Sequence, residues 1–227
     1  MVTTSPPAAY AAGRGRRWIL VAGLIVVFVA VLDIVVVLAW PGHHTSRPLR
    51  FAPPPNASAL NADARNLVAL LQRGSGLTVH ATYRATPDPV TLELWEQAPR
   101  VREDIAQSAG GHTAQTTTMT DGPIDRICYR RDSGPLTCQV VTAVQRQAVG
   151  LDGIIAAIVG GLAGQPVAVT SSTVAGVKAE CFTVGTETRI CLAADGLPVL
   201  ISSRKVTYQL ASRSTTVDPA VFTPPKP

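Results

Sequence analysis

The stretch LTVHATYRA, residues 77–85, decides the fold that the sequence predicts. Apolar or small side chains occupy every second position from Leu77 to Ala85, and polar side chains, including His80 and Arg84, occupy the positions between them. Successive side chains of a β-strand point to opposite faces of the sheet. The strict alternation therefore predicts a strand with one buried and one solvated face.

Similar strand patterns continue along the chain and are separated by turn sequences. Asp121-Gly122-Pro123 and Asp195-Gly196 are typical turn residues between such segments. A long meander of consecutive antiparallel strands is the simplest arrangement for them. The further strands are expected at residues 90–94, 101–105, 112–120, 167–174, 197–203 and 206–212.

Two segments have helical rather than strand periodicity. Residues 58–73 place Leu60, Leu67 and Leu71 on one face and end before Gly74, which predicts an amphipathic helix. Residues 147–164 carry bulky apolar side chains on one face and mostly glycine and alanine on the other. Such a helix is stable only when its apolar face is buried. It either docks on the sheet as part of the core or forms the wall of an apolar cavity.

The four cysteines form two equally spaced pairs. Nine residues separate Cys128 from Cys138, nine separate Cys181 from Cys191, and a turn signal lies near the middle of each segment. Folding each segment into a hairpin places its two cysteines opposite each other, so two disulfides are expected. A four-cysteine zinc site does not fit this spacing. Disulfides indicate an oxidising compartment.

The N-terminal part has the properties of a membrane anchor. Residues 18–40 contain one charged side chain, Asp33, and are long enough as a helix to cross a bilayer. Arginines before this segment predict a cytoplasmic N-terminus. A cleaved signal peptide is the alternative, but the apolar run is longer than such peptides require. Asp33 is either an intramembrane functional acid or an acid drawn toward the headgroups.

This topology predicts four parts along the chain, with everything after the span outside the cytoplasm. They are a disordered cytoplasmic tail at residues 1–17, a single transmembrane helix at 18–40, a proline-rich linker at 41–57, and an extracytoplasmic domain at 58–225.

The domain resembles the LolA-like family of lipoprotein carriers and related envelope lipoproteins. The resemblance is carried by residues 77–85, the segment around 99–102, the Asp121-Gly122 turn, Asp195-Gly196-Leu197-Pro198 and the ending at 218–225. It implies an α+β fold in which a strongly curved antiparallel sheet, a half-barrel, wraps around one or two helices, in addition to the transmembrane helix. It also implies an apolar cavity. The candidate lining residues are Val79, Ala81, Tyr83, Leu92, Leu94, Val101, Ile154, Ile158 and Leu162.

No recognisable catalytic or cofactor-binding motif accompanies this pattern, so we expect a non-enzymatic protein without a cofactor or catalytic metal. The formal net charge of +5 is too small to indicate nucleic-acid binding. Two functions are left. The first is binding of lipid or another acyl-bearing envelope molecule in the cavity. The second is a protein-interaction or sensing module with an envelope protein partner. In both, the lipid bilayer holds the protein at the cell membrane.

Overall fold

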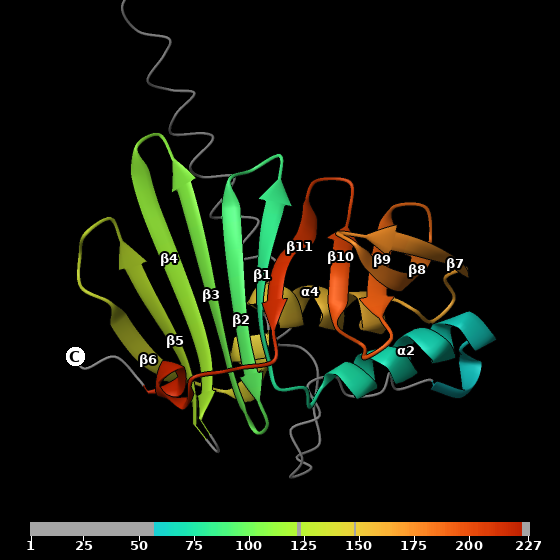
Figure 1. The fold of residues 1–227 in the computed structure, drawn as a ribbon, viewed down its shortest axis with the longest axis horizontal. Helices are drawn as coiled ribbons and strands as arrows, with labels where there is room; N and C mark the ends of the chain where they lie inside the picture. The colour runs from blue at the N-terminus through green and yellow to red at the C-terminus, as the bar shows by residue number, and fades with distance from the viewer. Residues whose placement is uncertain (1–56, 122–123, 148, 224–227) are drawn as a thin grey trace, which may run out of the picture. The chain divides into compact units, whose positions relative to one another are not determined.

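The computed structural model describes residues 57–121, 124–147 and 149–223, and it is dominated by one antiparallel sheet (Figure 1). In the described part of the chain this sheet has eleven strands in the order β6-β5-β4-β3-β2-β1-β11-β10-β9-β8-β7. The strands of the first half are β1 (Val79–Thr86), β2 (Val90–Gln97), β3 (Arg100–Ala109), β4 (His112–Asp121), β5 (Ile124–Arg131) and β6 (Thr137–Val141). Those of the second half are β7 (Val167–Val174), β8 (Val177–Val184), β9 (Thr188–Ala193), β10 (Pro198–Ser202) and β11 (Thr207–Ser214).

Short helices lie before, between and after the two runs of strands. They are α2 (Ala62–Gly74), α3 (Ala143–Gln147) and α4 (Gly150–Gly160), with the 3₁₀ turns η1 (Ala57–Ala59) and η2 (Pro219–Phe222). The Asn61 side chain caps α2 by accepting a hydrogen bond from the Ala64 N–H at 2.8 Å. This cap explains why the helix begins later than the apolar pattern from residue 58 predicts.

The two runs of strands become one sheet because β1 pairs with β11. Tyr83 lies opposite Leu210 in this pair, after an irregularity at residues 82 and 83. The Tyr83 hydroxyl, which is buried, donates to the Pro198 carbonyl oxygen at 2.9 Å. Its aromatic ring thus contributes to the core while its polar end has a partner in the second half.

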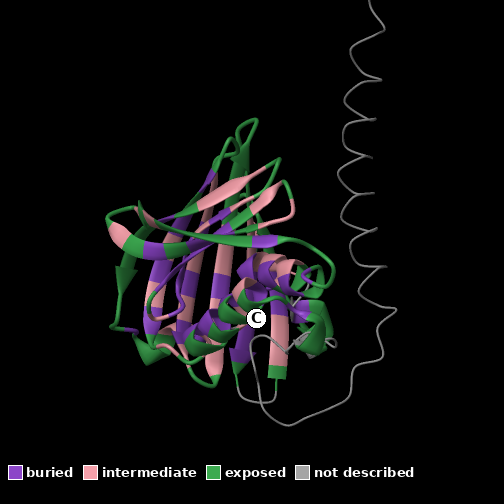
Figure 2. Cartoon of the chain, turned by 90° about the vertical axis from the view of Figure 1, so that its right-hand side faces the viewer, coloured by how far each residue is buried: buried purple, intermediate pink, exposed green. Residues whose placement is uncertain are grey.

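The register defines one face of the sheet, here called the inner face, on which the helices pack. Directly paired residues share a face, so Ala81, Leu94 and Glu103 all point inward. The same holds for a second row that crosses the other half, made up of Ala85, Tyr208, Ile201, Ile190, Phe182 and Val169. Figure 2 shows the buried residues in the middle of the strands and along the helices, with exposed residues at the hairpin tips.

Side chains of α2 and α4 join the inner face in one hydrophobic cluster. Leu67 and Leu71 of α2 and Leu151 and Ile155 of α4 are each at most 1% exposed. Burying a leucine or isoleucine side chain contributes about 1.5 to 3 kcal/mol. The apolar faces that the sequence predicts for both helices therefore cover the sheet.

The expected fold class needs correction. The expectation of an α+β half-barrel wrapped around one or two helices, with a transmembrane helix, is contradicted by a single open eleven-stranded sheet with few helices among the described residues. The expectation gave the helices too much of the fold, because periodicity marks the two helical segments but does not report that all the strands join in one sheet. No helix in the described part is long and apolar enough to cross a membrane. The predicted span at residues 18–40, including Asp33, lies outside the described residues.

Both cysteine pairs are disulfides in the structure. Cys128 bonds to Cys138 between β5 and β6, and Cys181 bonds to Cys191 between β8 and β9. These are the pairs that the spacing predicts. Cys181 and Cys191 are fully buried, whereas Cys138 is exposed on the short strand β6. The first bridge therefore fastens an edge strand, and the second lies in the core.

The end of α2 packs closely against the β9–β10 turn. The contact requires glycine at both Gly74 and Gly196. Gly196 has a φ of +88°, and a Cβ atom there would lie 2.1 Å from the Leu70 carbonyl oxygen.

We expect Gly196→Ala to lower the free energy of unfolding by about 3 kcal/mol or more, since backbone strain and steric overlap both contribute. Gly110→Ala is the matched control, because Gly110 has a φ of +58° and nothing within 4 Å. It should cost about 1 kcal/mol. Urea unfolding measures both, and equal losses would contradict the close approach.

The two disulfides allow a comparison at constant loop length, because both have a sequence separation of 10. Replacing either pair by alanines should remove about 3 kcal/mol of chain-entropy stabilisation. The change Cys181→Ala with Cys191→Ala should cost about 1 kcal/mol more than the change at Cys128 and Cys138, because it also leaves a buried cavity. Thermal unfolding under non-reducing conditions tests this, and a larger loss for the Cys128–Cys138 pair would be the opposite result.

Candidate functional site

The residues predicted to line a cavity lie in the core cluster of the described domain. Val79, Ala81, Tyr83, Leu92, Leu94 and Leu162 are at most 4% exposed, and Val101, Ile154 and Ile158 are partly buried against them. The side chains of α2 and α4 contribute to the same cluster. The structure thus brings all nine residues together, and it does so by packing them against the domain's own helices.

A strand carboxylate holds the beginning of α4. Glu103 is fully buried on the inner face, and its Oε2 accepts a hydrogen bond from the Leu151 N–H at 3.2 Å. A carboxylate at this end of a helix also interacts favourably with the helix dipole. Gly150 has a φ of +79°, and a Cβ atom there would lie 1.9 Å from Glu103 Oε2. Glycine at position 150 is what lets the helix approach β3.

Next to this contact, α3 and α4 are tied to the sheet by a buried arginine. Arg146 of α3 is 8% exposed, and its Nη1 donates to Asp152 Oδ2 of α4 at 3.3 Å. Its Nε lies 2.8 Å from Asp125 Oδ1 of β5 as an ion pair, although the N–H does not point at that oxygen as in a hydrogen bond. Thr120 donates to the same Asp125 oxygen at 2.6 Å. One guanidinium therefore joins two helices and a strand.

The outer face of β1–β3 carries a stacked group of aromatic and basic side chains. The His80 and Trp95 rings stack with centroids 4.8 Å apart, and the Arg102 guanidinium lies 5.4 Å from the Trp95 ring centroid. Arg102 also donates to the Val221 carbonyl oxygen at 2.7 Å. Phe222 is 2% exposed and lies under the Arg100 guanidinium. Phe222 packs on the sheet, so the C-terminal turn η2 covers part of this face.

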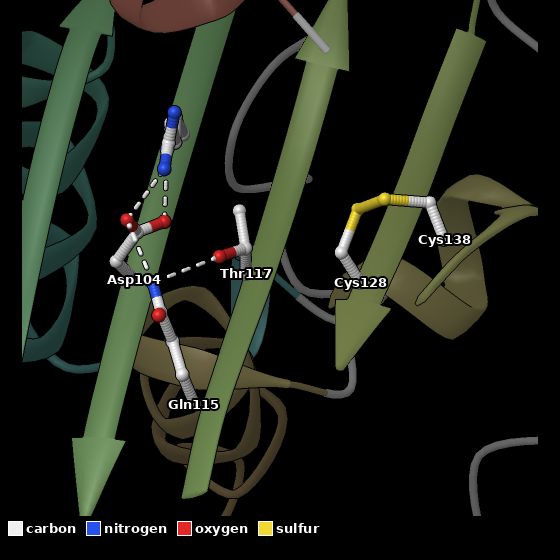
Figure 3. Close-up of a disulfide and its surroundings, with 6 residues drawn as sticks. Asp104, Gln115, Thr117, Cys128 and Cys138 are labelled. Atoms are coloured by element: carbon white, nitrogen blue, oxygen red, sulfur yellow. Dashed lines mark hydrogen bonds and ion pairs between the residues drawn. A yellow bond between two sulfur atoms is a disulfide. The ribbon is translucent and has the colours of Figure 1, made fainter. Parts of the chain in front are cut away.

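A polar row runs from this stacked group to the first disulfide (Figure 3). Asp104 accepts two hydrogen bonds from Arg102 and one from Gln115, whose amide also lies 3.5 Å from the Thr117 hydroxyl. Thr117 lies opposite Cys128 in the β4–β5 pair. Because every member is paired within the sheet, this row serves to order the strands.

At the tip of β4 and β5, the pKa of the Asp132 carboxyl is held below its usual range. The main cause is a hydrogen bond from the Thr113 N–H, followed by the hydrogen bond with the His112 side chain. In the other half of the sheet, burial raises the pKa of the Tyr208 hydroxyl, and the negative charge of Asp88 adds to the rise. The Asp132 shift thus comes from hydrogen bonds in the hairpin, and the Tyr208 shift comes mainly from burial.

An open groove lies beside β7, the strand at one end of the sheet. The groove has a volume of about 450 Å³ and lies between the end of α2 and the ends of β7, β8 and β9. Its apolar lining comes from Leu70, Ala179, Leu192 and Ala193, and Lys178 and Glu180 are its charged members. A second, smaller hollow of about 300 Å³ lies beside the end of α4 and includes Ile158. Of the nine predicted cavity residues, Ile158 alone lines either of these two hollows.

No arrangement for metal binding occurs in the described ranges, where no cluster of three or more His, Cys, Asp or Glu side chains is placed to hold an ion.

Sequence reasoning missed Glu103 and Arg146 as elements of the fold. Glu103 occupies a position in the alternation between Val101 and Ile105 where an apolar residue is expected. A single acid in an apolar register was the available signal.

Comparisons with known proteins give a partial likeness in shape. No family model and no curated protein matches the chain. Similar solved structures include the complex of MucA and MucB from Pseudomonas aeruginosa, with 17% identity and a TM-score of 0.46 over 72% of this chain and 62% of that one. A crystal structure of MucB in complex with MucA(peri) has 18% identity and a TM-score of 0.37 over 70% of this chain and 57% of that one.

The chain thus spans about three fifths of the length of these solved chains. At this level the likeness assigns neither a family nor a partner. The LolA-like family stays a prediction.

The buried arginine can be tested by substitution. Arg146→Met should lower the free energy of unfolding by about 3 to 5 kcal/mol, because the fully buried Asp152 and the partly buried Asp125 lose the guanidinium that compensates their charge. Arg84→Met is the matched control on an exposed arginine and should change stability by less than about 0.5 kcal/mol. Adding Asp125→Asn and Asp152→Asn to Arg146→Met should recover most of the loss. Urea unfolding would contradict this account if the triple variant were less stable than Arg146→Met alone.

Proposed function

We propose that the described domain is a non-enzymatic, extracytoplasmic protein-interaction module. The observation that carries this proposal is the difference in exposure between the inner face of the sheet and the strands at its two ends. The inner face is occupied by α2 and α4 of the same chain, while the strands at both ends of the sheet, β6 and β7, are exposed. The surfaces available to a partner are therefore edges and outer surfaces, which suit a polypeptide better than an acyl chain.

The two disulfides support the extracytoplasmic part of the proposal. Bonded cysteine pairs persist in oxidising compartments and are rare in the cytosol. Cys138 lies exposed on an edge strand, where a reducing environment would reach it. A module that works outside the cytoplasm can keep this bridge and with it the position of β6.

The exposed apolar side chains also support an interaction role. Exposed apolar patches on soluble domains mark interaction surfaces more often than isolated apolar residues do. Among the large exposed apolar residues, Ile124 and Val140 are diagonal neighbours on one face of the β5–β6 pair. Tyr129 lies on the other face of that pair, Val144 lies on α3, and Val169 lies on β7.

Binding of a lipid or another acyl-bearing molecule is the competing function, and it places different demands on the domain. An acyl chain would need a continuous apolar volume, so Ile155 and Val159 of α4 would have to separate from the inner face that buries them. Separation would expose a large apolar area at a cost of about 25 cal/mol per Å². The protein-interaction function needs no such rearrangement.

The test is gentle isolation of the full-length protein from its native host after brief chemical crosslinking, followed by mass spectrometry of protein and lipid. We expect a specific crosslinked protein and lipid far below one molecule per chain. The control is the same isolation with Arg146→Met, which loosens α3 and α4 and should raise the nonspecific lipid signal. One tightly held lipid per chain without a protein adduct would overturn the proposal.

A further inference from the structure

In the described part of the chain, strand β7 lacks the protection that natural proteins give to the ends of their sheets. Exposed edge strands are normally short, charged, interrupted by proline or covered, because their free backbone groups pair with other chains. β6 is short, with five residues, and is fastened by the Cys128–Cys138 bridge. β7 has eight residues, VAVTSSTV, without a charge or a proline, and most of them are exposed. An edge of this kind is suited to accept another strand.

The hairpin geometry identifies which backbone groups of β7 face outward. β7 and β8 are joined by Ala175 and Gly176, both with positive φ, and Val174 pairs with Val177. In such two-residue hairpins the closing pair is hydrogen-bonded and the bonded pairs then alternate along the ladder. The Gly185 N–H donates to the Pro166 carbonyl oxygen at 2.9 Å, which agrees with this alternation. The N–H and C=O groups of Val169, Ser171 and Thr173 therefore point away from β8.

Of these three positions, Val169 lies at the end of an apolar row on the inner face, whereas Ser171 and Thr173 lie opposite Glu180 and Lys178. Phe182, Ile190 and Ile201 are at most 3% exposed, but Val169, directly opposite Phe182, is 39% exposed. The row is thus complete on one side of Val169 and open on the other. The adjoining groove of about 450 Å³ has the apolar side chains of Leu70 and Leu192 among its lining residues. A further strand with apolar side chains on the inner face would cover both.

We propose that the free edge of β7 and the groove beside α2 bind an extended segment of a partner protein, which pairs with β7 as an additional strand. This inference rests on the proposed function and names its binding site. The segment has apolar side chains on its inner face. One lies opposite Val169, where it continues the row, and the next, two residues along, lies opposite Ser171, which lines the groove with Leu192. Uncharged polar side chains lie between them. Main-chain hydrogen bonds supply affinity, and the groove supplies selectivity. A second copy of this chain is the competing occupant.

Two lysine substitutions separate the edge from the rest of the strand. Val169→Lys places a charge at the open end of the apolar row and should block strand addition. Thr170→Lys is the matched control, because Thr170 is an exposed neighbour whose side chain lies on the other face and whose N–H points toward β8. Both positions are exposed, so both variants should keep the melting temperature of the parent protein.

The experiment is site-specific photocrosslinking of the full chain in living cells of its native host. A photoreactive residue replaces Thr173 on β7, Val140 on β6 or His112 at the β4 tip. We expect a protein adduct from position 173, lost with Val169→Lys and kept with Thr170→Lys. Mass spectrometry should place the adduct in an extended segment of alternating pattern. A synthetic peptide of that segment should slow hydrogen exchange of the Val169, Ser171 and Thr173 amides at least about tenfold.

The outcomes distinguish this inference from the function on which it rests. Adducts from position 140 or 112 alone would overturn the assignment to β7 and leave a protein-interaction function in place. An adduct between two copies of this chain at position 173 would overturn the inference of a different partner and show self-association through β7 instead. A position-173 adduct that survives Val169→Lys would exclude strand addition. Absence of protein adducts at all three positions would overturn the proposed function together with the inference.

Discussion

The pairing of β1 with β11 is the contact on which the described domain depends. Each half of the sheet is a meander held by hairpins between neighbouring segments, whereas Val79–Thr86 and Thr207–Ser214 lie far apart in the chain. Bringing these two strands together closes a long loop and costs conformational entropy, which contacts within each hairpin do not offset. The buried Tyr83 hydroxyl bond to Pro198 and the contact between α2 and Gly196 span the same junction. Together they produce one continuous inner face for α2 and α4.

Local patterns in the sequence predict much of this arrangement. The alternation predicts a strand at residues 167–174, which are the bounds of β7, and Pro99, which breaks the pattern, lies in the turn between β2 and β3. The cysteine spacing predicts both bridges. These features depend on neighbours in the chain, so a single sequence contains the information for them. The β1–β11 pair and the small share of helix in the fold depend on contacts between distant segments, which periodicity does not report.

The candidate site shows the same limit in another form. A bulky apolar helix face fits equally well as the filling of a core or the wall of a cavity, so the pattern around Ile154 and Leu162 left both open. The structure packs that face with the leucines of α2. The acids were more informative than the apolar residues. Glu103 and Asp152 each interrupt an apolar register, and both lie in the contact that places α4 on the sheet. A buried acid persists only where a specific partner compensates its charge.

The asymmetry between the two sheet ends connects this packing with function. The charged contacts through Arg146 and the Cys128–Cys138 bridge fix the β5–β6 end, so that part of the sheet is a rigid frame. At the other end, the second bridge lies between β8 and β9, one strand inward from the edge. β7 is therefore held by one ladder of hydrogen bonds against a firmly fixed β8. Among the described residues, the outer hydrogen-bonding groups of this strand have no neighbouring strand, although the strand itself is ordered. A binding strand that is already ordered lowers the entropy cost of binding.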